Sequence, residues 1–407
     1  MKCRFCRAEL THMFLDLGFA PPSNAYLTVD DLNRPEKYFP LRTKVCDQCW
    51  LVQTEDYADA GDLFSADYAY FSSTSTSWLK HAADFSHDII QRLGLNKSSM
   101  VIEVACNDGY LLKNFVGAGI PCLGIEPTTG TAAAAQQQGI TVIRDFFDEK
   151  LANEITGSGH QADLVIGNNV YAHVPDITGF TNGLRAVLKP GGTITLEFPH
   201  LLQLVQNCQF DTVYHEHFSY FSLRTVQEIF EACSLRIFDV EEIDTHGGSL
   251  RIYGCHSEDE RQASSAVDEL LEKEARSGLR ELKTYQQFQS RADCIKNELL
   301  SFLIEKKREG KRVVAYGAAA KGNTLLNYAG IKTDLLPLIY DASLSKQGKF
   351  MPGSHIPIVP PSAMDEELQD YVLIIPWNIA AEVRGQLAHL VEKRTKFVTA
   401  VPRLDIE

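Results

Sequence analysis

The densest group of side chains that could move a proton lies in the run D-T-V-Y-H-E-H-F-S-Y-F-S, residues 211–222. It brings Tyr214, His215, Glu216 and His217 side by side. A metal site is one interpretation, but histidines two apart do not share a helix face, and H-E-x-x-H is not matched. A satisfied structural network is a second. The third is acid–base chemistry, in which a histidine takes a proton, a carboxylate fixes its tautomer and a tyrosine hydroxyl donates to a developing oxyanion.

A second group with chemical potential is the run V-I-E-V-A-C-N-D-G-Y-L-L, residues 101–112. It predicts a buried strand, a tight polar turn and a helix start, whose backbone N–H groups face whatever lies above the strand end. About twenty residues later another apolar stretch ends on Glu126, and a carboxylate there can accept hydrogen bonds from two ribose hydroxyls.

The glycine pattern of this turn separates two cofactor classes. The dehydrogenase fingerprint G-x-G-x-x-G is absent, so a nicotinamide cofactor is not favoured. The turn fits the methyltransferase pattern acid-x-Gly-x-Gly-x-Gly, with Glu103 as the acid, Ala105 and Asn107 in the first two glycine positions and Gly109 retained. A purely structural strand–turn–helix is the alternative.

Two C-x-x-C knuckles begin the chain, Cys3–Cys6 and Cys46–Cys49. Such a pair usually supplies four thiolates to a tetrahedral zinc ion, and four thiolates leave no open position, so the predicted site is structural. Buried free cysteines or a redox pair are the alternatives.

The elements that must position these groups alternate between strands and helices from residue 98 to about 253. Helices are predicted at 81–93 and 131–138, and strands at 101–104, 122–125, 141–143, 163–167 and 193–198, the last after a turn at 188–192. This alternation predicts a doubly wound parallel sheet with ligands above the carboxyl ends of its strands. Polar clusters follow the third and fourth strands: Asp145-Phe146-Phe147, and Asn168-Asn169 with His173 beyond.

A second α/β unit starts at residue 312. Its strand, Gly-rich turn and helix start contain Lys321, which favours a phosphate or pyrophosphate, although the P-loop spacing fails and ATP hydrolysis is not expected. A cationic loop follows at 346–349, and further strands are predicted near 340, at 371–376 and at 396–401. An ordinary α/β turn and a solvated charged loop are the alternative.

Between the two units, residues 258–310 have helical apolar spacing and predict a connecting helix.

Length and charge limit the classes of function. A chain of 407 residues is expected to form two or three domains. Its net charge of −14 argues against sequence-independent binding to nucleic acid. No apolar run reaches the length of a membrane span, and no signal peptide is evident. We therefore expect a cytoplasmic protein, and a monomer.

The order of these motifs resembles the S-adenosylmethionine-dependent sugar C-methyltransferases that act on nucleotide-linked 4-keto-deoxysugars. The resemblance covers essentially the whole chain and rests on the two knuckles and on E-V-A-C-N-D-G-Y-L-L, Y-H-E-H-F-S-Y-F-S, Y-G-A-A-A-K-G-N-T-L and K-Q-G-K-F-M-P-G-S-H-I-P. It implies a zinc-binding domain at 1–67, a Rossmann-like class I methyltransferase domain at 68–255, connecting helices at 256–310 and a second Rossmann-like domain, binding the nucleotide sugar, at 311–407.

The resemblance also implies roles for individual residues. Structural zinc is expected on Cys3, Cys6, Cys46 and Cys49. S-adenosylmethionine is expected near Glu103, Ala105, Asn107, Gly109, Glu126, Pro127, Asp145, Phe146, Phe147, Asn168 and Asn169. The predicted catalytic residues are His217, Tyr214, Glu216 and His173. The predicted substrate contacts are Tyr68, Tyr70, Glu197, His200, Lys321, Gly322, Asn323, Thr324, Asp341 and Lys349.

The function implied is C-methylation of a nucleotide-diphosphate-linked keto-sugar at C3, in branched-chain deoxysugar biosynthesis. His217 would remove the proton next to the ketone, and Tyr214 or His173 would stabilise the enolate oxygen. Methylation at C5, methyl transfer to oxygen or nitrogen, and a non-catalytic nucleotide-sugar-binding protein are the alternatives.

Overall fold

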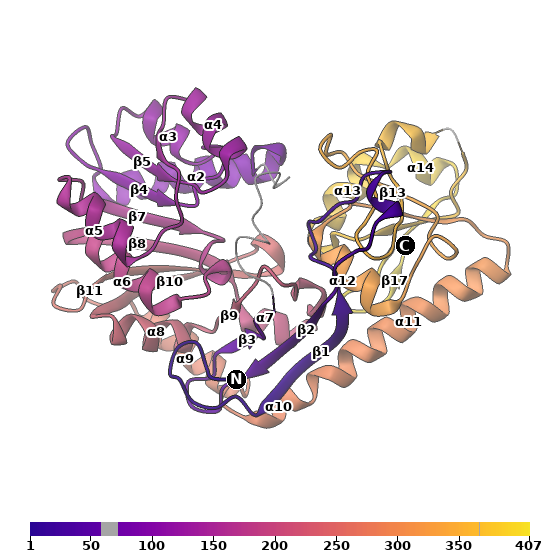
Figure 1. Cartoon of the computed structure of the whole chain (residues 1–407), viewed down its shortest axis with the longest axis horizontal. Coiled ribbons are helices and arrows are strands. Elements are labelled where there is room, and N and C mark those ends of the chain that lie inside the picture. Colours follow the sequence, from indigo (N-terminus) through magenta and orange to yellow (C-terminus); the bar gives the residue numbers. More distant parts are fainter. Residues whose placement is uncertain (58–71, 366) are drawn as a thin grey trace.

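The computed structural model describes residues 1–57, 72–365 and 367–407, which fold around three β-sheets (Figure 1). The predicted α/β fold class is confirmed. The first sheet is antiparallel, with strand order β1-β2-β3-β9. Its strands are β1 (His12–Ala20), β2 (Phe39–Val45), β3 (Val52–Thr54) and β9 (Ser219–Tyr220). Because β9 directly follows the Tyr214–His217 motif, the N-terminal module holds one end of that motif.

The central sheet has seven strands in the order β10-β11-β8-β7-β4-β5-β6. The five strands from β8 to β6 pair in parallel, and β11 and β10 extend the sheet in antiparallel pairing. The strands are β4 (Val101–Val104), β5 (Cys122–Ile125), β6 (Thr141–Ile143), β7 (Ala162–Asn168), β8 (Leu188–Pro199), β10 (Leu235–Ile243) and β11 (Ser249–His256).

Helices cover both faces of this sheet, as a doubly wound fold requires. One apolar core contains side chains of α2 (Thr76–Leu93), α3 (Leu112–Gly117) and α4 (Thr129–Gln137). The core on the other face contains side chains of α5 (Glu149–Gly157), α6 (Ile177–Val187) and α8 (Leu223–Ala232). Two short elements, η3 (Tyr171–His173) and η5 (Thr245–Gly247), follow β7 and β10, and α7 (Leu201–Gln206) and η4 (Phe210–Thr212) precede the Tyr214–His217 motif.

Two predictions about the local structure are wrong. The predicted turn at 188–192 belongs to β8, which runs unbroken from Leu188 to Pro199. The predicted connecting helix is divided into α9 (Ser265–Arg276), α10 (Leu282–Gln286) and α11 (Phe288–Arg308). The first break occurs at Gly278, whose φ of +79° lies in the left-handed region and ends a helix.

The third sheet, at the C-terminus, has the strand order β14-β13-β12-β15-β16-β17 and is parallel except for its last pair. Its strands are β12 (Val313–Tyr316), β13 (Ile339–Tyr340), β14 (Ile358–Val359), β15 (Tyr371–Ile374), β16 (Lys396–Thr399) and β17 (Asp405–Ile406). The helical elements of this part are α12 (Ala320–Ala329), η6 (Pro361–Asp365), η7 (Trp377–Ile379), α13 (Ala380–Gln386) and α14 (His389–Glu392).

The N-terminal and C-terminal parts share one apolar core. Phe14 of β1 packs on Tyr285 and Phe288, with ring centroids 5.6 and 4.5 Å apart. Figure 1 shows α11 running along the C-terminal part after passing β1. No helix in the described ranges combines the length and the apolarity that a bilayer span requires.

Candidate active site

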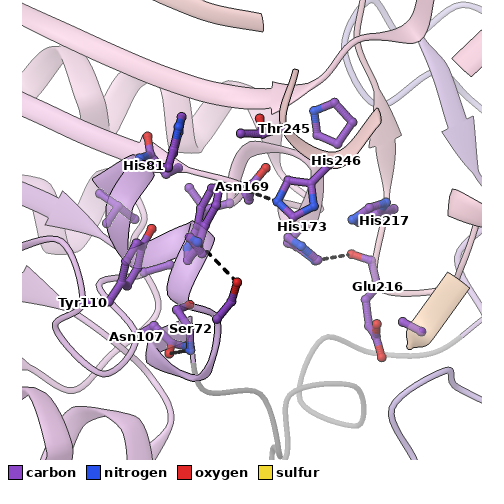
Figure 2. A pocket seen from close by; sticks show the side chains of 18 of the residues that line it. Ser72, His81, Asn107, Tyr110, Asn169, His173, Glu216, His217, Thr245 and His246 are labelled. Atoms are coloured by element: carbon purple, nitrogen blue, oxygen red, sulfur yellow. Dashed lines mark hydrogen bonds between the residues drawn. The ribbon is translucent and has the colours of Figure 1, made fainter. Parts of the chain in front are cut away.

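A cavity of about 1310 Å³ lies between the carboxyl ends of the central strands and the C-terminal part of the chain. Its walls include one side of α2, the turn after β4, and the segments at the ends of β5, β6 and β7. The Tyr214–His217 motif, η5, the start of α12 with Lys346, and residues 376–382 also line it. Figure 2 shows His173, Glu216, His217 and His246 at one side of the cavity and Asn107 and Tyr110 at the other.

His217 is buried and held as a neutral imidazole. Its Nδ1 donates to the carbonyl of Thr212 at 3.2 Å, so in the neutral ring Nε2 carries the lone pair. That Nε2 accepts a hydrogen bond from the Tyr214 hydroxyl at 2.8 Å. Burial and the neighbouring His173 hold the pKa of His217 well below its ordinary value. The nitrogen that can accept a proton is thus unprotonated at neutral pH.

His173 and Glu216 complete this wall of the cavity. The Nδ1 of His173 donates to the carbonyl of Glu216 at 2.8 Å, and burial lowers the pKa of His173 to about 4. The Oε2 of Glu216 accepts from the Asn24 side-chain amide at 2.9 Å, and burial raises the pKa of Glu216 to about 7. His215 does not line the cavity, because its ring packs beside Phe39 instead.

The turn after β4 has a shape that few side chains adopt. Ala105, Asn107 and Gly109 all have positive φ, at 58°, 50° and 80°. A Cβ on Gly109 would lie 2.5 Å from Ile140, so only glycine fits there. Glu126 faces this turn from the end of β5, where its carboxylate accepts from the backbone N–H groups of Asn107 and Thr128 at 3.0 Å each.

Polar atoms without protein partners also face the cavity at the end of β7. Neither the amide nitrogen nor the amide oxygen of Asn168 has a hydrogen-bond partner within the described residues, although both are buried. Asp145, Phe146 and Phe147 line the same region, and the Phe146 side chain is half-exposed. A buried amide needs a partner, so this group of atoms is suited to a polar ligand.

Two lysines face the cavity from the C-terminal part. Lys321 donates to Asn378 Oδ1 at 2.6 Å, its Nζ lies 4.5 Å from the centroid of the Trp377 ring, and burial lowers its pKa to about 8. Lys346 donates to the carbonyl of Ala318 at 2.9 Å. These cations are suited to an anionic group of a ligand.

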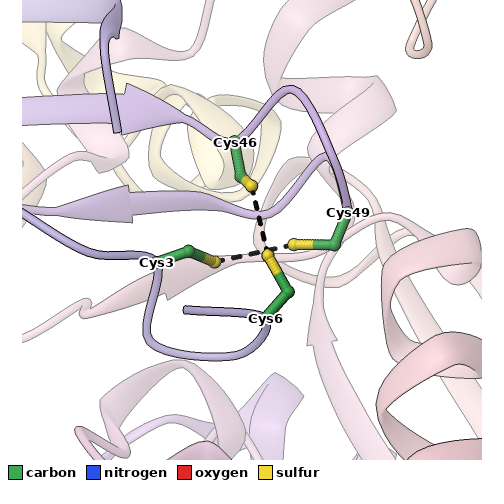
Figure 3. Close-up of side chains that lie close together, drawn as sticks. All are labelled: Cys3, Cys6, Cys46 and Cys49. Atoms are coloured by element: carbon green, nitrogen blue, oxygen red, sulfur yellow. Dashed lines mark hydrogen bonds between the residues drawn. The ribbon is translucent and has the colours of Figure 1, made fainter. Parts of the chain in front are cut away.

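The four N-terminal cysteines converge outside the cavity (Figure 3). Their Sγ atoms all lie within 4.8 Å of one another, and the Cys3–Cys49 and Cys6–Cys46 pairs are 3.6 and 3.5 Å apart. A tetrahedron of thiolates with bonds of about 2.3 Å to zinc has sulfur atoms about 3.8 Å apart. The cluster therefore fits zinc.

Three families match consecutive parts of the chain. They are described as "Putative zinc binding domain" for residues 3–64, "Methyltransferase domain" for 78–239 and "C-methyltransferase C-terminal domain" for 244–402. The C-methyltransferase NovU of Streptomyces niveus is 33% identical over 401 residues, which cover 98% of this chain and 95% of NovU. The chain belongs to this C-methyltransferase family.

More distant similarities cover only part of the C-methyltransferase. The ubiquinone biosynthesis O-methyltransferase of Pseudomonas paraeruginosa is 27% identical over 146 residues, 32% of this chain and 61% of that protein. Among solved structures, magnesium protoporphyrin IX methyltransferase (ChlM) from Synechocystis PCC 6803 with bound SAH aligns with 44% of this chain and 83% of its own, at 15% identity and a TM-score of 0.35.

The C-methyltransferase is an S-adenosylmethionine-dependent enzyme. Its own residues fit that cofactor. The Glu126 carboxylate, the Asn168 amide, which has no partner among the described residues, and the tight turn at Asn107 all line the cavity. The four-cysteine cluster fits a structural zinc ion, since all four positions of the tetrahedron are taken by sulfur and none is left for substrate.

The cavity brings together most of the residues predicted to bind the cofactor or to act on the substrate. Those that line it are Ala105, Asn107, Glu126, Pro127, Asp145, Phe146, Phe147, Asn168, Asn169, His173, Tyr214, Glu216, His217 and Lys321. Glu103, in β4, and Gly109, in the turn after it, are absent from the cavity lining. Glu103 is buried with both oxygens unpartnered in the described part of the chain, and burial raises its pKa well above its ordinary value.

Other predicted substrate residues do not line the cavity. Glu197 is buried under it, where its carboxylate accepts from His81 at 3.0 Å and Arg251 at 3.1 Å. His200 bonds to Glu274 at 2.8 Å. Gly322, Asn323, Thr324, Asp341 and Lys349 are absent from the cavity lining, and Tyr68 and Tyr70 lie outside the described residues.

Among the residues that line the cavity but were not predicted to belong to the site are Trp78, His81, His246 and Lys346. Lys346 lies in the predicted cationic loop at 346–349, but Lys349 was the residue predicted to contact the substrate. A signal for His246 existed in its two following glycines, because His-Gly-Gly favours a turn with positive φ.

Proposed function

We propose that this C-methyltransferase adds a methyl group to a carbon next to the ketone of a nucleotide-diphosphate-linked 4-keto-deoxysugar, at C3, in branched-chain deoxysugar biosynthesis. The observation that carries the proposal is the neutral His217, whose Nε2 accepts a hydrogen bond inside a cavity shared by the Glu126 turn and two lysines. Carbon methylation begins with removal of a carbon-bound proton by a base. Methyl transfer to oxygen does not require this step.

The first step is proton removal. A ketone acidifies its neighbouring C–H, so Nε2 of His217 takes that proton while the C–H electron pair becomes the enolate double bond and charge moves to the ketone oxygen. The Tyr214 hydroxyl, which donates to Nε2 in the free protein, then turns to the oxygen and stabilises its charge.

The second step forms the new carbon–carbon bond. S-adenosylmethionine, when bound, supplies an electrophilic methyl group and leaves as S-adenosylhomocysteine. Lys321 and Lys346 hold the diphosphate and Glu216 faces the sugar, so the chain fixes the enolate carbon in line for attack.

The test is a mass-spectrometric screen of thymidine, cytidine and guanosine diphosphate 4-keto-sugars with methyl-deuterated S-adenosylmethionine, followed by NMR of the product. We expect a labelled methyl group on C3, and exchange of the C3 proton with solvent deuterium in D2O. A labelled methyl group on oxygen or nitrogen, without carbon-proton exchange, would overturn the proposal.

Variants of the motif sharpen this test. His217→Asn and Tyr214→Phe should lower turnover about 10²- to 10⁴-fold. Calorimetric titration should give unchanged affinity for S-adenosylmethionine, because neither side chain contacts the Glu126 turn in the described structure. His215→Asn is the matched control, since His215 is adjacent in sequence but outside the cavity, and it should keep near wild-type turnover.

A further inference from the structure

His246 is a cavity residue that the steps above do not use. It lies in η5 with φ +55° and ψ +17°, a left-handed conformation that is costly for a residue with a Cβ. Gly247 and Gly248 follow with φ of 91° and 111°. Non-glycine residues held in such conformations cluster at functional sites.

The surrounding structure holds η5 in this shape from several directions. Thr245 donates to Glu197 at 3.2 Å, and Gln209 donates to the carbonyl of Gly247 at 2.7 Å. A Cβ on Gly247 would lie 2.3 Å from the ring of Trp377, so the C-terminal part presses on the loop. The backbone conformation of His246 is therefore fixed by contacts with the surrounding protein.

The protonation state of His246 follows from its hydrogen bond to Asn169. The Asn169 side-chain nitrogen donates to Nε2 at 3.3 Å, so in the neutral imidazole the hydrogen is on Nδ1. Burial, with Lys321 as the next cause, lowers the pKa of His246 to about 4, which keeps the ring neutral. Figure 2 shows the dashed bond from Asn169 to this ring.

Three imidazoles line this wall, and they differ in whether their Nδ1–H already has a hydrogen-bond acceptor in the protein. The Nδ1 of His217 is occupied by the carbonyl of Thr212, and that of His173 by the carbonyl of Glu216. His246 makes no second hydrogen bond to any described residue. It also lies near enough to His217 to contribute to the lowered pKa of that base.

We propose that His246 is a further catalytic residue, whose Nδ1–H donates a hydrogen bond to the ketone oxygen of the substrate as negative charge develops there. This inference rests on the proposed function. The ketone oxygen is separated from the acidic carbon by a single carbonyl carbon, so a donor to it must lie beside the base. A neutral imidazole whose backbone is held in place can stabilise an enolate oxygen by donating a hydrogen bond from Nδ1.

The experiment measures enolisation separately from methyl transfer. The keto-sugar nucleotide is incubated in D2O with the enzyme and S-adenosylhomocysteine, which has no methyl group to give, and deuterium at the α-carbon is followed by NMR. His246→Gly keeps the left-handed backbone and removes the donor, and we expect its exchange rate to fall about 10²- to 10³-fold. Affinity for S-adenosylhomocysteine should be unchanged.

A second variant guards against a misfolded loop. His246→Asn tolerates positive φ and can bring an amide N–H to the position of Nδ1, so its exchange rate should recover to within about tenfold of wild type. The matched control is His355→Gly, because His355 also has positive φ, at 57°, but lies outside the cavity. It should leave the exchange rate unchanged.

The outcomes separate this inference from the function on which it rests. Wild-type exchange in His246→Gly, or slow methyl transfer with normal exchange, would overturn the role of His246 alone. Equal losses in the Gly and Asn variants would also overturn it, because the donor would then not matter. Methylation by the wild-type enzyme without any α-proton exchange would remove the proposed function and this inference together.

Discussion

Glu216 is a cavity carboxyl group whose charge changes near neutral pH. Burial raises its folded-state pKa from 4.5 to about 7, while Asn24 opposes the shift. A raised carboxyl pKa stabilises the fold at low pH, and this contribution is lost as pH rises through the folded pKa. Compared with the Glu216→Gln variant, the wild type should therefore lose about 2 to 3 kcal/mol of unfolding free energy between pH 5 and 8.5.

The measurement is urea unfolding of the wild type and Glu216→Gln at both pH values. The variant should gain stability relative to the wild type as pH rises, since an amide can keep the Asn24 contact without acquiring charge. Glu305→Gln on the surface of α11 should not diverge in this direction. A constant difference for Glu216→Gln across the range would mean that the carboxyl is ionised throughout.

At the residue scale, a functional site can be predicted where several reactive side chains are adjacent in the sequence. Tyr214 and His217 stand in one short run, and the structure brings them to 2.8 Å. Glu197 could not be interpreted in this way, because its partner Arg251 lies opposite it on β11, a strand that the pattern did not reveal. Gly247 and Gly248 indicate a turn after His246, but no neighbouring reactive side chain indicates a catalytic role for this histidine.

The element that joins the zinc module to the candidate active site is β9. It pairs with β3, and Thr54 of β3 donates from its hydroxyl to the carbonyl of His217 at 3.0 Å and from its backbone N–H to Phe218 at 3.1 Å. Gln53, the neighbouring residue of β3, contacts the cysteine cluster, where its side-chain amide donates to Cys3 Sγ at 3.2 Å. Hydrogen bonds made by β3 thus link the cysteine cluster to His217.

Loss of one zinc ligand should therefore impair catalysis as well as folding. Cys46→Ser removes a thiolate, and we expect lower zinc content, a lower melting temperature and lower turnover in the same sample, because metal binding supplies folding energy to such modules. Cys294→Ser is the control, since Cys294 is an exposed thiol on α11. Wild-type turnover and melting in a zinc-depleted Cys46→Ser protein would show that β9 does not depend on the metal.

Element order was predictable because buried strands and their polar ends leave a clear pattern. The strands from Val101 to Ile166 and the C-terminal strands β12, β13, β15 and β16 were found near their predicted positions, whereas the two-residue strands β14 and β17 were not predicted. The antiparallel strands β10 and β11 were missed, since their alternation is obscured by charged residues such as Glu241 and Arg251. The N-terminal sheet was also missed, because its fourth strand lies far along the chain.

On the scale of the whole molecule, three separate parts of the chain build one cavity, and Trp377 is where the C-terminal part meets the other two. Its Nε1 donates to Asp211 Oδ2 at 2.7 Å, its ring lies beneath Lys321, and it packs on the η5 glycine. Asp211 is buried, and burial, opposed by Lys321, raises its pKa to about 6. The indole therefore links the motif loop, η5 and the lysine wall.

Trp377→Phe keeps a ring and removes the N–H donor. The buried Asp211 carboxylate then loses its partner, which should cost about 1 to 3 kcal/mol of unfolding free energy. Because Lys321 and η5 both rest on this side chain, turnover should fall and KM for the nucleotide sugar should rise. Affinity for S-adenosylmethionine should not change, since the Glu126 turn is formed by other elements. Denaturant unfolding, steady-state kinetics and calorimetry on one preparation measure the three quantities. Trp50→Phe is the matched control, because Trp50 stacks on Tyr285 outside the cavity, and it should change neither KM nor turnover. If Trp377→Phe weakened cofactor binding as much as substrate binding, the C-terminal part would be stabilising the whole enzyme and not the substrate side of the cavity.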